Sequence, residues 1–202
     1  MSAVLALAQT LTNLMIAPAG PGMPSGWKLS RIHGVDPPTF EVTRSHTLRV
    51  TAIGQGGTAT YRLRSPIRPS PSVRQGTITW RWRAGTPLRG ADLKRRAGDD
   101  SPIRVVITFQ DGRSIAYSWG NREGRGESFG SWAGRNRIVV VLQRAEDADG
   151  SWHEERRDPF SDYRRLWNGA PKPIVSIGIA ADTDALKIRS AAEVGDLTWH
   201  GP

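Results

Sequence analysis

Short stretches in which apolar and polar side chains alternate, separated by turn residues, restrict the fold of this chain more than any other feature. Residues 77–83 read TITWRWR, so an extended backbone puts Ile78, Trp80 and Trp82 on one face and only threonine and arginine on the other. Large aromatic side chains on one side of a strand are typical of a core-facing surface. The segment therefore predicts a sheet whose tryptophan-bearing face is covered by a second layer.

Further segments predict about ten short strands in all. Residues 103–109 and 114–119 alternate in the same way, and the polar Asp111-Gly112 turn between them predicts a hairpin. Residues 152–156 are expected to pair behind the turn at 148–150. The other predicted strands cover residues 27–32, 39–43, 48–53, 58–63, 138–142, 173–180 and 194–199.

Two short helices complete the predicted secondary structure. One is expected over 91–97, before Gly98, and one over 160–167, where Asp158 is placed to cap the helix and Pro159 to start it. Many short strands with few helices are typical of two stacked sheets. The predicted fold class is all-β: a two-sheet antiparallel, jelly-roll-like β-sandwich with one or two short helices.

The first 26 residues differ in composition from the rest, because no charged side chain precedes Lys28. The apolar stretch from Met1 ends in Ala17-Pro18-Ala19, which is similar to the end of a secretory leader, although the usual positive residues are missing. We therefore expect an export leader or a disordered tail over 1–26, with a short packed helix as the alternative. A single β-sandwich domain is expected over 27–202, in a periplasmic or secreted protein, or a cytoplasmic one if no leader is present.

Composition excludes several classes of site. The chain has no cysteine, which excludes disulfides, thiolate catalysis and cysteine-based metal centres, and its four histidines lack the spacing of a helical metal motif. No apolar run reaches the roughly 18 residues of a membrane span. The net charge of +9 favours acidic partners, but the arginines alternate with acids and no nucleic-acid-binding motif accompanies them. Nucleic acid is therefore not an expected partner.

Several segments together resemble a bacterial family known only as domain-of-unknown-function family 3047. They include TWRWRA at 79–84, IAYSWGN at 115–121 and EVGDLTW at 193–199, and the longer segments 91–109 and 152–185 have the expected order and spacing. The resemblance implies a β-rich, often exported bacterial domain without an established activity. This chain has Ala185-Leu186 where the family usually has Asn-Thr, and Ala192-Glu193 where the family usually has an aromatic pair.

The outward faces of the predicted strands contain the candidate ligand-binding residues. If the strands adjoin, Arg81, Arg83 and Arg104 form one polar strip, and planar guanidinium groups suit carboxylate or phosphate oxygens. Trp119 and Trp132 at the rim could stack on sugar rings, with core packing as the alternative for Trp119. Asn121, just beyond Trp119, could bind a hydroxyl group. The long glycine-rich segment 120–135 could cover such a groove.

Five carboxylates are candidate ligands for a structural calcium ion, the only cofactor considered. Asp99 and Asp100 are adjacent in a predicted loop, and Asp182 and Asp184 form a D-x-D pattern at a strand end. Asp196 lies in an ending similar to that of jelly-roll modules that bind carbohydrate, in which such an acid can ligate calcium. Ion pairing with nearby arginines is the favoured alternative for the first two.

These observations predict a non-catalytic binding module for a saccharide or an acidic cell-envelope ligand. The alternative is a hydrolase or lyase that acts on a polysaccharide and uses carboxylates in the groove of the sandwich, which requires a facing pair from different strands. A third reading is a structural partner of an envelope assembly, which would expose a large apolar patch. The sequence predicts no oligomeric state.

Overall fold

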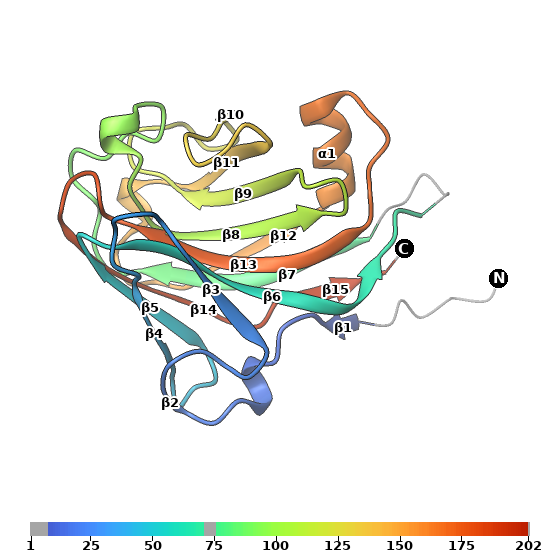
Figure 1. Cartoon of the computed structure of the whole chain (residues 1–202), viewed down its shortest axis with the longest axis horizontal. Coiled ribbons are helices and arrows are strands. Elements are labelled where there is room, and N and C mark those ends of the chain that lie inside the picture. Colours follow the sequence, from blue (N-terminus) through green and yellow to red (C-terminus); the bar gives the residue numbers. More distant parts are fainter. Residues whose placement is uncertain (1–7, 71–75, 202) are drawn as a thin grey trace.

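The computed structural model describes residues 8–70 and 76–201, which form two stacked β-sheets with one α-helix at one end (Figure 1). The eight-stranded sheet contains β1 (Ala8–Thr10), β2 (Gly20–Pro21), β4 (Thr39–Val42), β5 (Leu48–Ile53), β7 (Thr77–Ala84), β12 (His153–Arg157), β14 (Arg189–Val194) and β15 (Thr198–His200). The seven-stranded sheet contains β3 (Trp27–Arg31), β6 (Gly56–Ile67), β8 (Ser101–Phe109), β9 (Ser114–Trp119), β10 (Ser128–Gly130), β11 (Arg137–Gln143) and β13 (Ile174–Asp182). The helices are α1 (Pro159–Trp167) and the 3-10 turns η1 (Leu14–Ile16), η2 (Arg96–Gly98) and η3 (Ala145–Asp147).

The predicted fold class is confirmed: the chain is a jelly-roll-like sandwich of two sheets. The strand order is β1-β15-β7-β14-β5-β4-β2 in one sheet, with β12 added to β7, and β10-β11-β9-β8-β13-β6-β3 in the other. One pair is not antiparallel as expected, because β11 runs parallel to β9. The connection over 120–136 brings the chain back to the end of the sheet where β9 began, so β11 repeats its direction. None of the described helices is both long enough and apolar enough to span a bilayer.

Three local predictions differ from the structure. β12 pairs with β7, with His153 opposite Trp82, so it is not a partner of the strand that precedes the turn at 148–150. The expected last strand over 194–199 is divided, because β14 ends at Val194 and β15 starts at Thr198. The expected helix over 91–97 is a loop ending in η2, closed by a hydrogen bond from the Asp92 amide to the Gly98 carbonyl at 2.8 Å.

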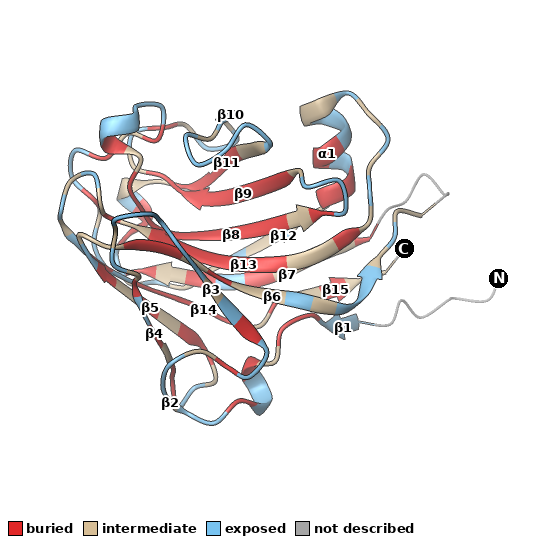
Figure 2. Ribbon diagram, viewed as in Figure 1, coloured by how far each residue is buried: buried red, intermediate tan, exposed pale blue. Residues whose placement is uncertain are grey.

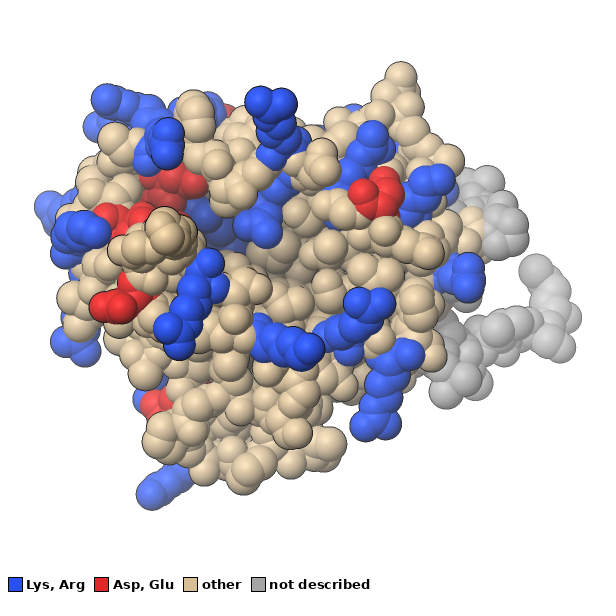
Figure 3. Space-filling model, viewed as in Figure 1, with Lys and Arg blue, Asp and Glu red and all other residues tan. Residues whose placement is uncertain are grey.

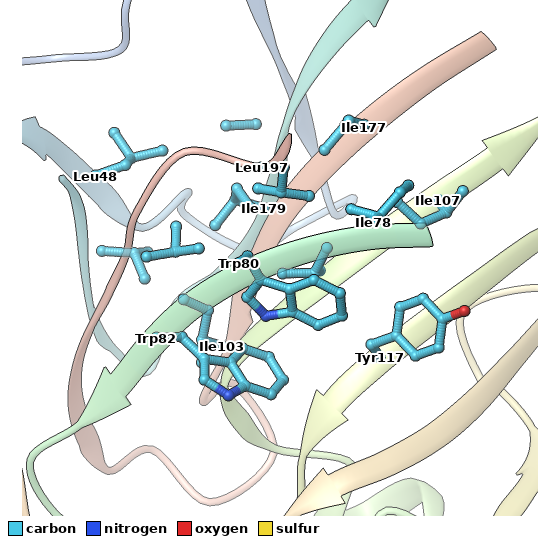
Figure 4. Close-up of a cluster of buried hydrophobic side chains, with 14 of the residues drawn as sticks. Leu48, Ile78, Trp80, Trp82, Ile103, Ile107, Tyr117, Ile177, Ile179 and Leu197 are labelled. Atoms are coloured by element: carbon cyan, nitrogen blue, oxygen red, sulfur yellow. The ribbon is translucent and has the colours of Figure 1, made fainter. Parts of the chain in front are cut away.

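The core between the sheets contains the aromatic side chains predicted to point inward. Trp80 and Trp82 are 3% and 0% exposed and lie edge to face, with ring centroids 5.7 Å apart. Trp80 also packs on Tyr117 of the opposite sheet at 5.5 Å (Figure 4). Trp82 packs on Trp119 at 5.6 Å. Figure 2 shows that the central strands of both sheets are largely buried. These contacts between the layers hold the sheets in a fixed relation.

Helix α1 forms as its sequence predicts. The Asp158 side chain accepts hydrogen bonds from the amides of Phe160 and Ser161 at 3.1 and 2.9 Å, which caps the helix. The rings of Phe160 and Tyr163 pack on Phe109 of β8 at 6.3 and 4.8 Å. The helix therefore covers the end of the sandwich where β8 finishes.

The described part of the N-terminal segment packs against the sandwich, although the folded domain was expected to begin near Trp27. Leu11 and Leu14 are 4% and 1% exposed, and β1 pairs with β15. The Asp196 carboxylate accepts hydrogen bonds from the Thr12 hydroxyl and from the amides of Leu14 and Met15, the last two at 3.0 Å. The fold thus includes residues 8–26, while the part of the predicted leader over 1–7 lies outside the described residues.

Candidate functional site

The arginines predicted to share one strip lie on opposite sheets. Arg81 and Arg83 are on the outer face of β7 in the eight-stranded sheet, whereas Arg104 is on β8 in the seven-stranded sheet. The predicted strip of Arg81, Arg83 and Arg104 is therefore wrong, because strands 77–84 and 101–109 are successive in the sequence without being neighbours in a sheet.

On the eight-stranded sheet, the two arginines are already engaged by side chains of the protein. The guanidinium carbons of Arg81 and Arg83 lie 4.7 and 4.8 Å from the ring centroid of Trp152. Arg83 and Arg49 also form ion pairs with Glu193 at 3.0 and 2.9 Å. Burial opposes the charge on this glutamate, but hydrogen bonds from Arg49, Arg83 and a threonine outweigh burial and lower its pKa. Arg49 and Arg83 therefore have an acidic partner, whereas Arg81 stacks on Trp152.

The other predicted contact residues have different environments. Trp119 is 1% exposed, and its indole N–H donates to the Arg144 carbonyl at 2.9 Å, so core packing applies and Trp119 cannot stack on a ligand at the rim. The Asn121 amide donates to the Ala91 carbonyl at 3.2 Å and anchors a loop. Trp132, between β10 and β11, is 54% exposed. It is the one of these three that presents a large exposed ring.

A cavity of about 230 Å³ opens on the outer face of the seven-stranded sheet, and we call it the arginine cavity. Its polar lining consists of Ser30, Arg31, Thr58, Arg104, Arg137 and Asp182. Its small or apolar lining consists of Ile32, Gly57, Ala133, Ala180 and Ala181. Figure 3 shows this face of the molecule, hollowed near its centre, with lysine and arginine side chains around the hollow.

Arg104 is the most deeply buried charged group in the lining, with 4% of the residue exposed. One terminal nitrogen donates both to the carboxylate of Asp99 at 2.7 Å and to its backbone carbonyl at 2.9 Å. The Nε atom of Arg104 is buried and has no hydrogen-bond partner among the described residues. Burial raises the pKa of Asp99, and the ion pair with Arg104 opposes that shift.

Arg137, at the start of β11, is a lining residue that the sequence interpretation missed. Its Nε donates to the Ser114 hydroxyl at 3.2 Å, and no carboxylate in residues 8–70 or 76–201 forms an ion pair with it. Burial first, and then the positive charge of Arg104, lower the pKa of Arg137. It shares a face of β11 with Val139 and Val141, which pack in a small cluster outside the main core, and the continuous apolar run 138–142 gives no signal of this in the sequence.

Three of the five predicted calcium ligands come together at the edge of the arginine cavity. Asp100, Asp182 and Asp184 offer oxygens within 4.8 Å of one another, whereas Asp99 pairs with Arg104 and Asp196 binds the N-terminal segment. Asp100 accepts hydrogen bonds from the amides of the two residues after Asp184, at 3.1 and 2.9 Å. Burial, reinforced by Asp184 and opposed by Arg104, raises the pKa of Asp182 to about 7.

A second hollow, on the eight-stranded sheet, is lined by carboxylates that are largely occupied by contacts within the protein. Its lining includes Glu155 and Asp196. Glu155 accepts hydrogen bonds from the Trp82 indole at 3.1 Å and from the Gln143 amide at 2.6 Å. Both acids therefore have structural partners, which leaves Glu154 as the other acid in that lining.

Comparisons with known proteins give a family and a fold. A family model described as "Protein of unknown function (DUF3047)" matches residues 25–198, and no curated protein matches the chain. The xyloglucanase domain of NopAA, a type three effector from Sinorhizobium fredii, solved with cellobiose, is 9% identical; 98% of this chain and all of that chain align, with a TM-score of 0.51. A family 11 carbohydrate-binding module from Clostridium thermocellum is 12% identical over 92% of this chain and 96% of that chain, with a TM-score of 0.43. The first of these likenesses shows the sandwich fold.

Proposed function

The chain belongs to the family described as protein of unknown function DUF3047, and from its geometry we propose that it is a non-catalytic saccharide-binding module. The proposed site is the arginine cavity on the seven-stranded sheet, together with the exposed ring of Trp132. The proposed ligand is a cell-envelope saccharide, which would require the protein to act outside the cytoplasm.

The observation that carries this proposal is a preformed set of hydrogen-bond donors in a hollow. Arg104 and Arg137 are held by Asp99 and Ser114, and N–H groups on both arginines lack a partner among the described residues. Sugars present many oxygens, and rigid donors bind them without first losing conformational freedom. The hydroxyl of Thr58 in the same lining adds a group that can donate or accept.

An exposed aromatic residue that adjoins a lining residue in the sequence is the second supporting feature. Trp132 directly precedes Ala133, which lines the cavity, and its ring is the largest exposed apolar side chain on the described surface. The apolar face of a sugar ring can stack on indole while its hydroxyls reach polar groups. The NopAA domain, which has the same sandwich fold, was solved with cellobiose, and this supports the proposed class of ligand.

Calorimetric titration of the full chain with a panel of neutral and acidic oligosaccharides tests the proposal. We expect a saturable heat with at least one saccharide. We expect W132A to lower the affinity about tenfold, or about 1.4 kcal/mol, because aromatic side chains often anchor a ligand. Trp152 provides a matched control, because it lies against Arg81 and Arg83 of the other sheet. Absence of binding to every saccharide, or equal weakening by W132A and W152A, would contradict the proposal.

One observation favours an enzyme as the second candidate function. Asp182 lines the cavity with a pKa of about 7, which is the property expected of a general acid or base. It is, however, the single carboxylate in the described lining of that cavity, whereas glycoside hydrolysis uses two across the scissile bond. Incubation of a bound oligosaccharide with the protein should leave it intact; shortened products that disappear in D182N would favour the enzyme.

A further inference from the structure

We propose that the arginine cavity selects saccharides carrying a negatively charged oxygen group, a carboxylate or a sulfate ester, which Arg104 and Arg137 bind together. This inference rests on the proposed function and specifies the class of ligand. It distinguishes this site from one built for neutral glucans, which would need donors and acceptors in the lining without a surplus of positive charge.

The charges in the lining are unequal. Three arginines, Arg31, Arg104 and Arg137, line the cavity, against one carboxylate, Asp182. Asp99, which does not line the cavity, neutralises Arg104. The remaining charges in the lining are the positive charges of Arg31 and Arg137 and the negative charge of Asp182. A cavity wall of low dielectric strengthens attraction between such groups and an anion. Asp100 and Asp184 meet Asp182 at the edge of the cavity without lining it, so the positive excess is confined to the lining itself.

The geometry of Arg104 indicates where an anion would bind. Asp99 takes both of its hydrogen bonds from the same terminal nitrogen, which leaves the other terminal nitrogen of Arg104 without a hydrogen bond among the described residues and, unlike the buried Nε atom, with some accessible surface. A ligand oxygen in the cavity can accept a hydrogen bond from this second terminal nitrogen. Because the pair with Asp99 fixes the guanidinium, the group is already oriented for this contact.

Arg137 supplies the second donor group. Only its Nε atom has a hydrogen bond among the described residues, to Ser114, so its two terminal nitrogens are free to donate. The positive charge of Arg104 is close enough to disfavour the charge on Arg137. An anion between two such guanidinium groups removes their mutual repulsion and accepts hydrogen bonds from both. Planar guanidinium forks match the geometry of carboxylate and sulfate oxygens.

The experiment compares matched ligands in calorimetric titrations of the full chain. One pair is tetragalacturonate and its methyl ester, and the other is a sulfated neutral tetrasaccharide and its unsulfated form. Tetrasaccharides limit the nonspecific attraction that a chain of net charge +9 has for long polyanions. The two pairs also separate a carboxylate from a sulfate as the preferred group.

Variants at Arg137 connect the preference to the cavity. R137A and the more conservative R137K should each weaken binding of the charged ligand, by about tenfold or more for R137A, with little effect on its neutral form. R164A is the control, because Arg164 is exposed on α1, beyond the opposite end of β13 from Asp182, and its loss changes the net charge equally. Unchanged melting temperatures confirm that the variants fold, and R137K preserves the packing of the stem if R137A does not.

The outcomes separate this inference from the proposed function. Tighter binding of a charged ligand than of its neutral form, lost in R137A and kept in R164A, supports the inference. Equal affinity for charged and neutral forms overturns the inference while the binding function stands. Equal weakening by R137A and R164A also overturns it, because attraction to the overall charge is then sufficient. No binding of any ligand overturns both.

Discussion

The guanidinium of Arg104 forms an ion pair with the carboxylate of Asp99 at 2.7 Å, and the two side chains are only 4% and 12% exposed. Burial of both charges is costly, so the pair adds little net stability while it is intact. Its consequence is geometric: it fixes the guanidinium of Arg104 in the lining of the arginine cavity, with the second terminal nitrogen free of hydrogen bonds among the described residues.

Loss of Asp99 should therefore be strongly destabilising. D99A leaves the charge of Arg104 buried without compensation, and we expect the free energy of unfolding to fall by about 3–5 kcal/mol. Urea unfolding of wild type and variant measures this difference. E146Q is the control, because Glu146 forms an exposed ion pair with Arg144 and its loss should cost no more than about 1 kcal/mol. Similar small effects in both variants would contradict the prediction.

Glu193 should stabilise the outer face of the eight-stranded sheet in a pH-dependent manner. It accepts hydrogen bonds from Thr47, Arg49 and Arg83, and its pKa is lowered despite burial. A carboxylate with a lowered pKa contributes stability above its unfolded-state pKa and loses it as the pH falls through the folded-state value. E193Q should cost about 1–3 kcal/mol at pH 7 and progressively less towards pH 3.

Chemical unfolding at several pH values measures that dependence. E41Q serves as the control, because Glu41 forms a half-exposed pair with Arg49 at the edge of the same network and should have a small effect. A constant difference between wild type and E193Q from pH 7 to pH 3 would show that the charge of Glu193 does not carry the effect.

Asp182 should have the opposite pH dependence. Its pKa of about 7 lies above the ordinary aspartate value of 3.8, so the folded state binds this proton more tightly than the unfolded state. Stability from this group is fully present below about pH 4 and is lost as the pH rises towards 7. D182N, which stays neutral, should therefore melt a few degrees above the wild type at pH 8, with a smaller gap at pH 5. Parallel melting curves at both pH values would contradict this.

In the alternating strands the direction of the side chains could be predicted from the sequence, but the neighbours of each strand could not. Alternation correctly put Trp80 and Trp82 in the core, because a pleated strand sends successive side chains to opposite faces. The same rule puts Arg81 and Arg104 on outer faces without saying that these faces belong to different sheets. Strand order depends on long-range pairing, such as that of β12 with β7, and periodicity has no information about it.

The candidate site was predicted in part for the same reason. Arg104 and Trp132 were singled out, and one lines the arginine cavity while the other precedes a lining residue. Arg137 was not predicted, because the apolar run that follows it in β11 has no alternation from which the direction of its side chain could be inferred. Three acids from the separate segments 99–100 and 182–184 meet only because β13 pairs with β8.

Asp196 should hold the N-terminal segment on the sandwich. Its carboxylate accepts from the Thr12 hydroxyl and from the amides of Leu14 and Met15. D196A removes all three acceptors, and we expect faster amide hydrogen exchange over residues 8–17 and a loss of about 1–3 kcal/mol in stability. D196N, which keeps one carbonyl oxygen, should be intermediate. Exchange in D196A that stays as slow as in the wild type would contradict this role.

Metal removal tests the predicted calcium site at Asp100, Asp182 and Asp184. Calcium needs six to eight oxygen ligands, but both oxygens of Asp100 already accept from the amides of Ala185 and Leu186. Arg104 also contributes a positive charge that attracts Asp182 and opposes a nearby cation. We therefore expect the melting temperature at pH 7 to be unchanged by a chelator and by millimolar calcium. A rise with calcium that is lost in D184N would instead assign a calcium site to this cluster, since D184N removes one charge without changing the shape of the side chain.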